Sequence, residues 1–386
     1  MKVFIVAGEP SGDALGAKLM RALRQSRWNV QFEGVGGAGM EAEGLKTLFP
    51  MADIAVMGFL PVLRRLPTLL NRIKVTAEAC IAAAPDVVVL IDSPDFTHRV
   101  AKKVRRAAPS IPILDYVSPT VWAWRPGRAR AMRAYFDHVL AVLPFEPEAH
   151  ARLGGPPCSY VGHPLIERFG DLRPRPEDAL QRAFERHVLL LPGSRMSEVT
   201  RLMPEFGEAV ARIAAAVPGA DFSLPVVPHV EGAIREAIRS WPVKPLLVFG
   251  EQAKWTAFRR ARAALAASGT VTLELGLAQV PMVTAYKVSR IEQAIIEALV
   301  TVSTPILPSL ILGEKVVPEF LQEQANGATL AEAMIPLLAD GPERQAQLAA
   351  FDRLDTAMQV PHASPSEAAA AIVTRYGDRD AVSAAG

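Results

Sequence analysis

Two carboxylates follow an apolar run in the segment PDVVVLIDSPDF, residues 85–96. Asp92 stands where the predicted strand ends, and α/β folds place catalytic groups at such positions. A carboxylate there can act as a general base toward a hydroxyl. Asp95 follows Pro94 and precedes a helical pattern, which is also typical of a helix cap. Asp92 is therefore the better candidate for a base, and a carboxylate satisfied within the turn is the alternative.

The segment VFIVAGEPSGDALGAKLMRAL, residues 3–23, predicts a strand, a turn and a helix. Its glycines follow G-x-x-x-G-x-x-x-G, which matches neither the dinucleotide fingerprint nor the P-loop. The loop carries Glu9 and Asp13, which would repel a phosphate, so we expect it to bind sugar hydroxyls. The alternative is that Ser11 or Asp13 caps the helix. The residues predicted to bind a sugar in the first half of the chain are Glu9, Ser11, Gly12, Asp13 and Asp95.

The segment LLLPGSRMSEV, residues 189–199, has the features of a phosphate site. Gly193 permits a tight turn after the strand, and Ser194 can cap the helix that follows. Arg195 then places a cation at the helix N-terminus, where backbone amides already favour anions. Ordinary turn chemistry is the alternative.

A second segment with the features of a phosphate site is AALAASGTVTLELGLAQVPMV, residues 263–283. Ser268, Gly269 and Thr270 allow the backbone to approach a diphosphate. Glu274, one helical turn after Thr270, can accept hydrogen bonds from a ribose diol. Each pattern alone also fits an ordinary turn, but together they predict a nucleotide site in the second half of the chain.

Alternating strand and helix patterns must position these residues. Short apolar stretches alternate with helical ones, which predicts parallel sheets covered by helices on both faces. In the first half the strand candidates are 2–7, 30–35, 86–91, 111–117 and 138–143, and the helical ones are 13–25, 64–84 and 96–107. The pattern restarts at 187–206, and further strand candidates are 222–227, 245–249, 263–267 and 282–286.

The simplest architecture is α/β, with two Rossmann-like domains facing a cleft. Residues 154–180 are rich in Gly, Pro and charge, which suits a linker. The predicted parts are a first domain with the loop expected to bind sugar hydroxyls, a second domain with the nucleotide site, and a C-terminal helical segment whose tail frays. Their predicted bounds are 1–165, 166–345 and 346–386.

The composition narrows the class of protein. The chain has 386 residues, 50% hydrophobic, with a formal net charge of +2, which is too small to indicate a polyanion partner by itself. Cys80 and Cys158 form no C-x-x-C pair, so a reducing compartment is the default. The longest apolar stretch, 298–312, is broken by two prolines and is too short to span a membrane. We expect a cytoplasmic protein, either free in solution or peripheral to a membrane, with no cofactor and no metal-binding motif.

The segment 98–133 is strongly basic and carries nine Lys or Arg against one acid, Asp115. Trp122 and Trp124 stand among these cations. Such a face can bind nucleic acid, anionic lipid headgroups or a substrate phosphate, and solvated helix faces are the alternative. The apolar and basic segment 57–74 is equally consistent with core helices and with a surface on anionic lipid.

One stretch, GVGGAG at Gly34 to Gly39, matches the dinucleotide fingerprint, with Asp53 at a tolerable distance. It lies in the second strand–helix unit, and Gly44 interrupts the helix that should follow. A lone match of this kind is weak evidence for NAD binding.

Taken together, these motifs resemble the lipid-A-disaccharide synthase family of inverting GT-B glycosyltransferases. The resemblance rests on VAGEPSGDALGA, PDVVVLIDSPDF, YVSPTVWAWRPGR, LPFE, LLPGSR, ASGTVTLE and PMVTAYKV, and it spans almost the whole chain in order. It implies transfer of 2,3-diacylglucosamine from its UDP derivative to 2,3-diacylglucosamine 1-phosphate without a metal ion.

By the same resemblance, the essential aspartate falls on Asp92 and the essential arginine on Arg195. Ser309 stands where the family usually has an Asn near the donor, so we assign it to the nucleotide side. The family works at the inner face of the cytoplasmic membrane. The resemblance therefore implies an anionic membrane surface as a partner, no nucleic acid, and a homodimer with exchanged C-terminal segments.

Overall fold

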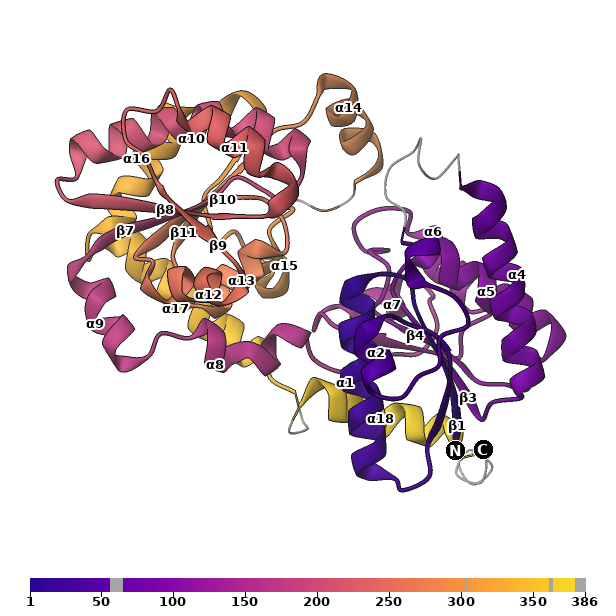
Figure 1. Cartoon of the computed structure of the whole chain (residues 1–386). Coiled ribbons are helices and arrows are strands. Elements are labelled where there is room, and N and C mark those ends of the chain that lie inside the picture. Colours follow the sequence, from indigo (N-terminus) through magenta and orange to yellow (C-terminus); the bar gives the residue numbers. More distant parts are fainter. Residues whose placement is uncertain (56–64, 301, 303, 361–363, 379–386) are drawn as a thin grey trace. The chain divides into compact units, whose positions relative to one another are not determined.

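The computed structural model describes residues 1–55, 65–300, 302, 304–360 and 364–378. The chain divides into two compact units, each built around its own parallel sheet (Figure 1). The first unit combines Met1–Ile166 with Met358–Gly386, and the second is Glu167–Ala357. The C-terminal helix thus belongs to the first unit rather than to a separate segment.

The first unit has a six-stranded sheet in the order β2-β1-β3-β4-β5-β6, and all of its pairs are parallel. Every residue of Val3–Ala7 and Val87–Ile91 is buried, because helices cover both faces of the sheet. Its strands are β1 Lys2–Ala7, β2 Gln31–Val35, β3 Val87–Ile91, β4 Ile113–Tyr116, β5 His138–Ala141 and β6 Cys158–Tyr160.

Helices α1 and α18, from opposite ends of the chain, pack together on one face of this sheet, and α4 packs on α5 over the other (Figure 1). The core under α4, α5 and α6 includes Phe4, Leu90 and Val100. The helices are α1 Pro10–Ser26, α2 Ala38–Ala42, η1 Met51–Asp53, α4 Leu66–Ala83, α5 Pro94–Ala107, α6 Gly127–Met132, α7 Glu146–Arg152 and α18 Pro365–Gly377.

The second unit repeats this plan with the order β12-β11-β10-β7-β8-β9. Its strands are β7 Arg186–Leu191, β8 Ala220–Val226, β9 Leu246–Phe249, β10 Ala263–Ala267, β11 Met282–Tyr286 and β12 Glu319–Leu321. Helices α10 and α16 pack together over one face, and α12, α13 and α17 lie on the other (Figure 1).

The helices of the second unit have the following bounds: α8 Phe169–Leu172, α9 Pro176–Phe184, α10 Met196–Ala216, η3 Pro228–Val230, α11 Glu231–Ile238, α12 Glu251–Arg260, α13 Val271–Leu277, α14 Arg290–Leu299, α15 Leu307–Leu312, η4 Gln322–Gln324, α16 Gly327–Leu338 and α17 Pro342–Ala357. The turn η2, Pro164–Arg168, lies where the first unit passes into the second.

The α/β architecture predicted from the sequence is confirmed. The first unit passes into the second at Ile166 and Glu167, within the segment 154–180 that the sequence predicts to link the halves. This segment is more regular than expected, because β6, η2, α8 and the start of α9 lie within it. The expected segment 57–74 is only partly described: residues 65–74 contain the start of α4, and 57–64 lie outside the described residues.

The glycine-rich segment after β2 is held by Asp13 of α1. Its Oδ1 accepts hydrogen bonds from the amides of Gly37 (2.8 Å) and Met40 (3.0 Å), and its Oδ2 from that of Gly39 (2.8 Å). Gly34 has φ +144°, and a Cβ there would lie 1.8 Å from the carbonyl oxygen of Ile5. The amides that a dinucleotide loop would offer to a pyrophosphate therefore bind a carboxylate of the same chain.

We predict that Asp13→Ala lowers stability, because three backbone amides lose their acceptor in a buried site. The expected cost is about 3 kcal/mol, which calorimetry would record as a lower unfolding midpoint. Glu41→Ala, on the exposed side of α2, is the matched control and should leave the midpoint unchanged. Equal midpoints for the wild type and Asp13→Ala would contradict this role.

Candidate functional site

In each sheet the predicted site residues follow two neighbouring strands whose helices lie on opposite faces. In the first unit these are β1 and β3, where Ala7 pairs with Ile91. In the second they are β7 and β10, where Leu191 pairs with Ala266. At such a switch point the two loops diverge, which leaves room for a ligand outside the carboxyl ends of the strands.

Glu9 and Asp92 are electrostatically coupled at the first switch point. Glu9 is the residue before α1, and burial is the main cause that raises the pKa of its carboxyl above the ordinary range. The charge of Asp92 adds to this rise, and the Ser93 hydroxyl opposes it. Two carboxylates therefore share one partly desolvated region, an arrangement that favours acid–base roles.

The backbone at Asp92 is strained. Asp92 (φ +53°) and Ser93 (φ +46°) both have left-handed conformations, which cost energy in residues other than glycine and cluster at functional sites. The Ser93 amide donates to Asp92 Oδ1 (2.7 Å), and Thr97 Oγ1 donates to the Asp92 carbonyl (2.7 Å). Within the described part of the chain, no hydrogen bond is found to Asp92 Oδ2.

The other residues predicted for the acceptor side have different surroundings. Ser11 is exposed in the first turn of α1, whereas Gly12 is buried, and a Cβ on it would lie 3.5 Å from side-chain atoms of Ala7 and Ile91. Asp95 is 94% exposed and lies 3.7 Å from Arg128 Nη2. Gly12 is therefore buried against β1 and β3, and the Asp13 carboxylate is occupied by the glycine loop.

A buried cluster behind Asp92 could not be inferred from the sequence, where Asp115 is only the lone acid of a basic stretch. Asp115 Oδ2 lies 3.7 Å from His98 Nε2, and His98 Nδ1 is 3.2 Å from the hydroxyl of Tyr135. Burial raises the pKa of Asp115, His98 opposes this rise, and Asp92 adds to it. The cluster joins β4 to α5 directly behind the loop that carries Asp92.

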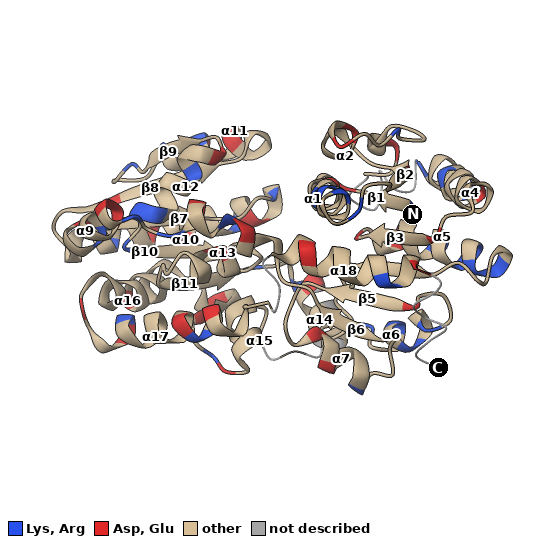
Figure 2. Ribbon diagram, turned by 90° about the horizontal axis from the view of Figure 1, so that it is seen from below, with Lys and Arg blue, Asp and Glu red and all other residues tan. Residues whose placement is uncertain are grey.

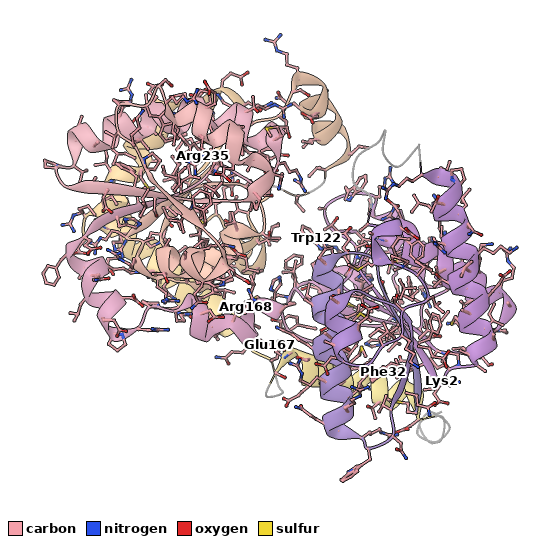
Figure 3. The ribbon with its side chains drawn as sticks, viewed as in Figure 1. Lys2, Phe32, Trp122, Glu167, Arg168 and Arg235 are labelled. Atoms are coloured by element: carbon pink, nitrogen blue, oxygen red, sulfur yellow. The ribbon has the colours of Figure 1, made fainter. Side chains whose placement is uncertain are left out.

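Glu146 fixes the tryptophan-containing loop after β4, and its role could not be inferred from spacing either. Its Oε1 accepts from Trp122 Nε1 (3.1 Å), and its Oε2 accepts from the amides of Val142 (3.1 Å) and Leu143 (2.9 Å). Trp122 is labelled in Figure 3. Burial raises the pKa of Glu146 to about 7, although these hydrogen bonds oppose the rise.

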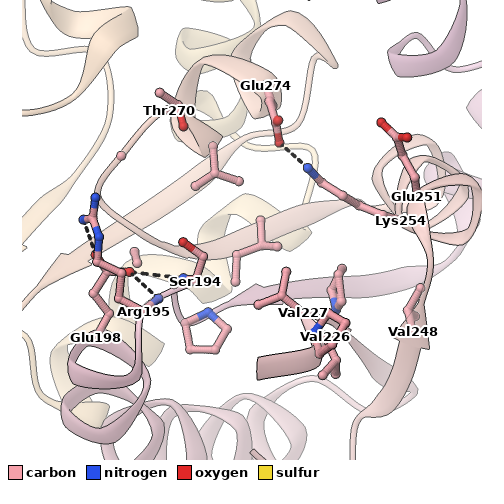
Figure 4. A pocket seen from close by; sticks show the side chains of 18 of the residues that line it. Ser194, Arg195, Glu198, Val226, Val227, Val248, Glu251, Lys254, Thr270 and Glu274 are labelled. Atoms are coloured by element: carbon pink, nitrogen blue, oxygen red, sulfur yellow. Dashed lines mark hydrogen bonds and ion pairs between the residues drawn. The ribbon is translucent and has the colours of Figure 1, made fainter. Parts of the chain in front are cut away.

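The second switch point opens into a cavity of about 770 Å³, a size typical of a small-ligand site (Figure 4). Seven of the eight residues predicted to bind nucleotide line it. They are Gly193, Ser194, Arg195, Ser268, Gly269, Thr270 and Glu274. Apolar side chains from the ends of β8 and β9, among them Val226, Val227 and Val248, line another part of the wall.

Glu198 organises the loop between β7 and α10. Its Oε2 accepts from the amides of Ser194 (3.1 Å) and Arg195 (3.2 Å), and its Oε1 from Arg195 Nη1 (2.9 Å). Gly193 has φ +108°, and a Cβ there would lie 2.4 Å from Glu198 Oε2. Arg195 rather than Ser194 is the N-cap residue, and its side chain is 75% exposed.

The loop after β10 forms the opposite part of the wall. The Ser268 amide donates a hydrogen bond to the carbonyl oxygen of Ala285 (3.2 Å). Thr270, which is exposed, immediately precedes α13. Ser309 is not brought to this cavity. It is 1% exposed in α15, where its Oγ accepts from the Val316 amide (3.3 Å).

We predict a pH-dependent contribution of Glu146 to stability. The carboxyl titrates near 4.5 when unfolded and near 7 when folded, so between these values the native chain retains a proton that the unfolded chain has released. The stability of the wild type relative to Glu146→Gln should therefore be greatest below about pH 4.5. It should fall by up to about 3 kcal/mol as the pH rises to about 7.

Unfolding midpoints of both proteins at several pH values between about 5 and 8 measure this difference. Glu148→Gln, an exposed change on the same helix, is the control and should show no such trend. A wild-type advantage that grows with pH would refute the assignment.

In the described part of the chain, no cluster of three or more His, Cys, Asp or Glu could hold a metal ion. Nor does any described helix have the length and apolar character needed to cross a membrane.

Comparisons with known proteins agree with this architecture. The family model for lipid-A-disaccharide synthetase matches residues 3–373. The chain is 55% identical to the lipid-A-disaccharide synthase of Rhodopseudomonas palustris (strain BisB18) over 374 residues, 96% of this chain and 94% of the relative. It is 54% identical to the one of Bradyrhizobium diazoefficiens, over 96% and 95% of the two chains.

Two solved structures share the fold. The glycosyltransferase of kitacinnamycin has a TM-score of 0.61 at 16% identity, over 97% of this chain and 98% of its own. The UDP-GlcNAc 2-epimerase from Neisseria meningitidis bound to UDP-GlcNAc has a TM-score of 0.57 at 13% identity, over 92% and 99% of the two chains. With its two Rossmann-like α/β units the chain thus has the GT-B fold, and it belongs to the lipid-A-disaccharide synthetase family.

Proposed function

We propose that Asp92 and Arg195 carry the transfer of 2,3-diacylglucosamine from UDP-2,3-diacylglucosamine to 2,3-diacylglucosamine 1-phosphate. The products are the β-1,6-linked lipid A disaccharide 1-phosphate and UDP. Family membership over almost the whole chain supports this reaction. The observation that carries the residue roles is the placement of Asp92 and Arg195 at the switch points of the two sheets.

In this proposal the first unit activates the acceptor. Asp92 accepts the proton of the acceptor 6-hydroxyl through its available Oδ2, and the oxygen attacks the anomeric carbon of the donor. Glu9 and the exposed Ser11 bind sugar hydroxyls beside Asp92. Asp95, whose side chain is almost fully exposed, lies at the edge of this site. Asp13 contributes indirectly, because it holds the glycine loop in place, and Gly12 is buried within α1.

The second unit holds the departing nucleotide. As the bond from the anomeric carbon to the diphosphate oxygen breaks, negative charge develops on UDP. The Arg195 guanidinium and the loop 268–270 stabilise this charge. Glu274 accepts hydrogen bonds from the ribose, and the apolar wall near Val226 and Val248 accommodates the base. Ser309 is buried away from the cavity and is left out of this proposal.

An epimerase or a glycosyltransferase with a soluble UDP-sugar is not favoured. The epimerases of known structure are 13–14% identical to this chain, so their likeness concerns the fold alone. Curated relatives of 52–55% identity are named lipid-A-disaccharide synthases.

We predict that Asp92→Asn lowers kcat by about 10²- to 10⁴-fold, because the amide cannot accept the proton. Asn tolerates the left-handed backbone at this position better than Ala does. The assay mixes both lipid substrates in detergent with EDTA and follows UDP and the disaccharide by mass spectrometry. Near-wild-type turnover of the variant would overturn the assignment of the base. Loss of wild-type activity in EDTA would overturn the metal-independent mechanism.

We also propose that the first unit docks on an anionic membrane surface. Leu66 and Leu70 of α4 are 40% and 49% exposed, and α4 packs on the basic helix α5. Figure 2 shows Lys and Arg along α5 and α6. The exposed cations of segment 98–133 are Arg99, Lys102, Lys103, Arg106, Arg125, Arg130 and Arg133. This surface suits lipid substrates at the inner face of a cytoplasmic membrane.

Binding to vesicles with anionic lipid should weaken as salt is raised, because exposed charges are screened within about 8 Å at physiological ionic strength. The triple variant Lys102→Glu, Lys103→Glu, Arg106→Glu should bind less than the wild type in a sedimentation assay. The matched control reverses Arg212, Arg235 and Arg239, three exposed cations of the second unit. Binding that is insensitive to both salt and the triple change would exclude this surface.

The homodimer that the family resemblance implies remains a prediction, which light scattering would test.

A further inference from the structure

Lys254 reaches from α12 to Glu274 of α13 along the wall of the cavity. Its Nζ lies 2.7 Å from Glu274 Oε2, and both side chains line the cavity (Figure 4). The side chains are 29% and 17% exposed, so the pair is much less solvated than a typical surface ion pair. The motifs in the sequence gave Lys254 no role.

The ammonium group of Lys254 is also held by aromatic side chains. It lies 4.3 Å from the ring centroid of Trp255 and 5.2 Å from that of Phe258. Both rings are nearly fully buried, at 3% and 0% exposure. Cation–π attraction to two fixed rings restricts the lysine to the position that faces Glu274.

The charges along the cavity wall are matched in pairs. Arg195 pairs with Glu198, and Glu251 pairs with Arg168 from outside the lining. Glu274 pairs with Lys254, which leaves its Oε1 without a hydrogen bond among the residues that the structure describes. The carboxylate therefore has one anchored oxygen and one that is available to a ligand.

An unpaired Glu274 would be unfavourable in a diphosphate site, because its charge would repel the ligand. The ammonium of Lys254 offsets this charge and fixes the rotation of the carboxylate at the same time. A carboxylate held in this way can accept hydrogen bonds from two adjacent hydroxyls without first losing side-chain freedom.

We propose that Lys254 is a positioning residue for the nucleotide: it orients Glu274 toward the ribose hydroxyls and offsets its charge beside the diphosphate. This inference rests on the proposed binding of the UDP moiety in the cavity of the second unit. Lys254 itself acts through Glu274 and contacts neither the sugar that is transferred nor the reacting atoms.

The test compares UDP with 2′-deoxy-UDP by calorimetric titration of the full chain. The two ligands carry the same charge, so the ratio of their Kd values isolates the hydroxyl contact from attraction to the phosphates. In the wild type the deoxy ligand should bind about tenfold more weakly, because a hydrogen bond to a charged group is lost. Lys254→Met should bring the ratio close to one and also weaken UDP itself several-fold.

Four further variants make this result specific. Glu274→Gln should lower the ratio as Lys254→Met does, and the double variant should add little, because both residues act in one contact. Lys254→Arg keeps the positive charge, so its ratio of Kd values should lie between those of Lys254→Met and the wild type. Lys244→Met removes an exposed lysine that donates to the carbonyls of Ile238 and Arg239, outside the cavity lining, and should change nothing.

The outcomes separate the two proposals. If the wild type binds UDP but Lys254→Met keeps the wild-type ratio, Lys254 does not position Glu274. A wild-type ratio near one would also overturn this inference, while the UDP site would stand. A folded wild type that does not bind UDP would overturn the proposed nucleotide site itself. A lower fraction of folded variant changes the measured stoichiometry and leaves the Kd ratio intact.

Discussion

The order of parallel strands is the constraint on which both halves of the molecule depend. In each sheet one pair of neighbours, β1 with β3 and β7 with β10, sends its helices to opposite faces. The loops that follow these strands separate, and backbone and side-chain groups at the strand ends remain accessible. Asp92 and the cavity that contains Arg195 both occur at such a point, although the two units differ in sequence.

Carboxylates repeatedly hold backbone amides near these strand ends. Asp13 binds the amides of the glycine loop, Glu198 those of Ser194 and Arg195, and Glu146 those of Val142 and Leu143. A glycine-rich loop beside a strand is therefore insufficient evidence for a phosphate, because its amides can bind a side chain of the same chain. In the second unit, the Arg195 side chain and the loop 268–270 are the groups that we propose for a phosphate.

Much of this arrangement could be predicted from the sequence. The strands around Val3 and Val87 are uninterrupted apolar runs, so their ends, and the placement of Asp92 there, follow from the pattern. The three-residue strands β6 and β12 have too little pattern to be recognised. The roles of Asp115, Glu146 and Lys254 depend on partners distant in sequence, His98, Trp122 and Glu274, which no local spacing indicates. Family resemblance alone predicts Ser309 at the nucleotide site. Its burial in α15, away from the cavity, depends on tertiary packing that the sequence does not reveal.

We propose above all that the second unit binds the nucleotide and that the first unit supplies the general base, Asp92. A crystal structure of the chain with UDP tests it most directly. We expect UDP in the cavity of the second unit, with its diphosphate at Arg195 and loop 268–270 and its ribose at Glu274. UDP bound instead at the glycine loop 34–39 of the first unit, with the Asp13 carboxylate displaced, would contradict the account.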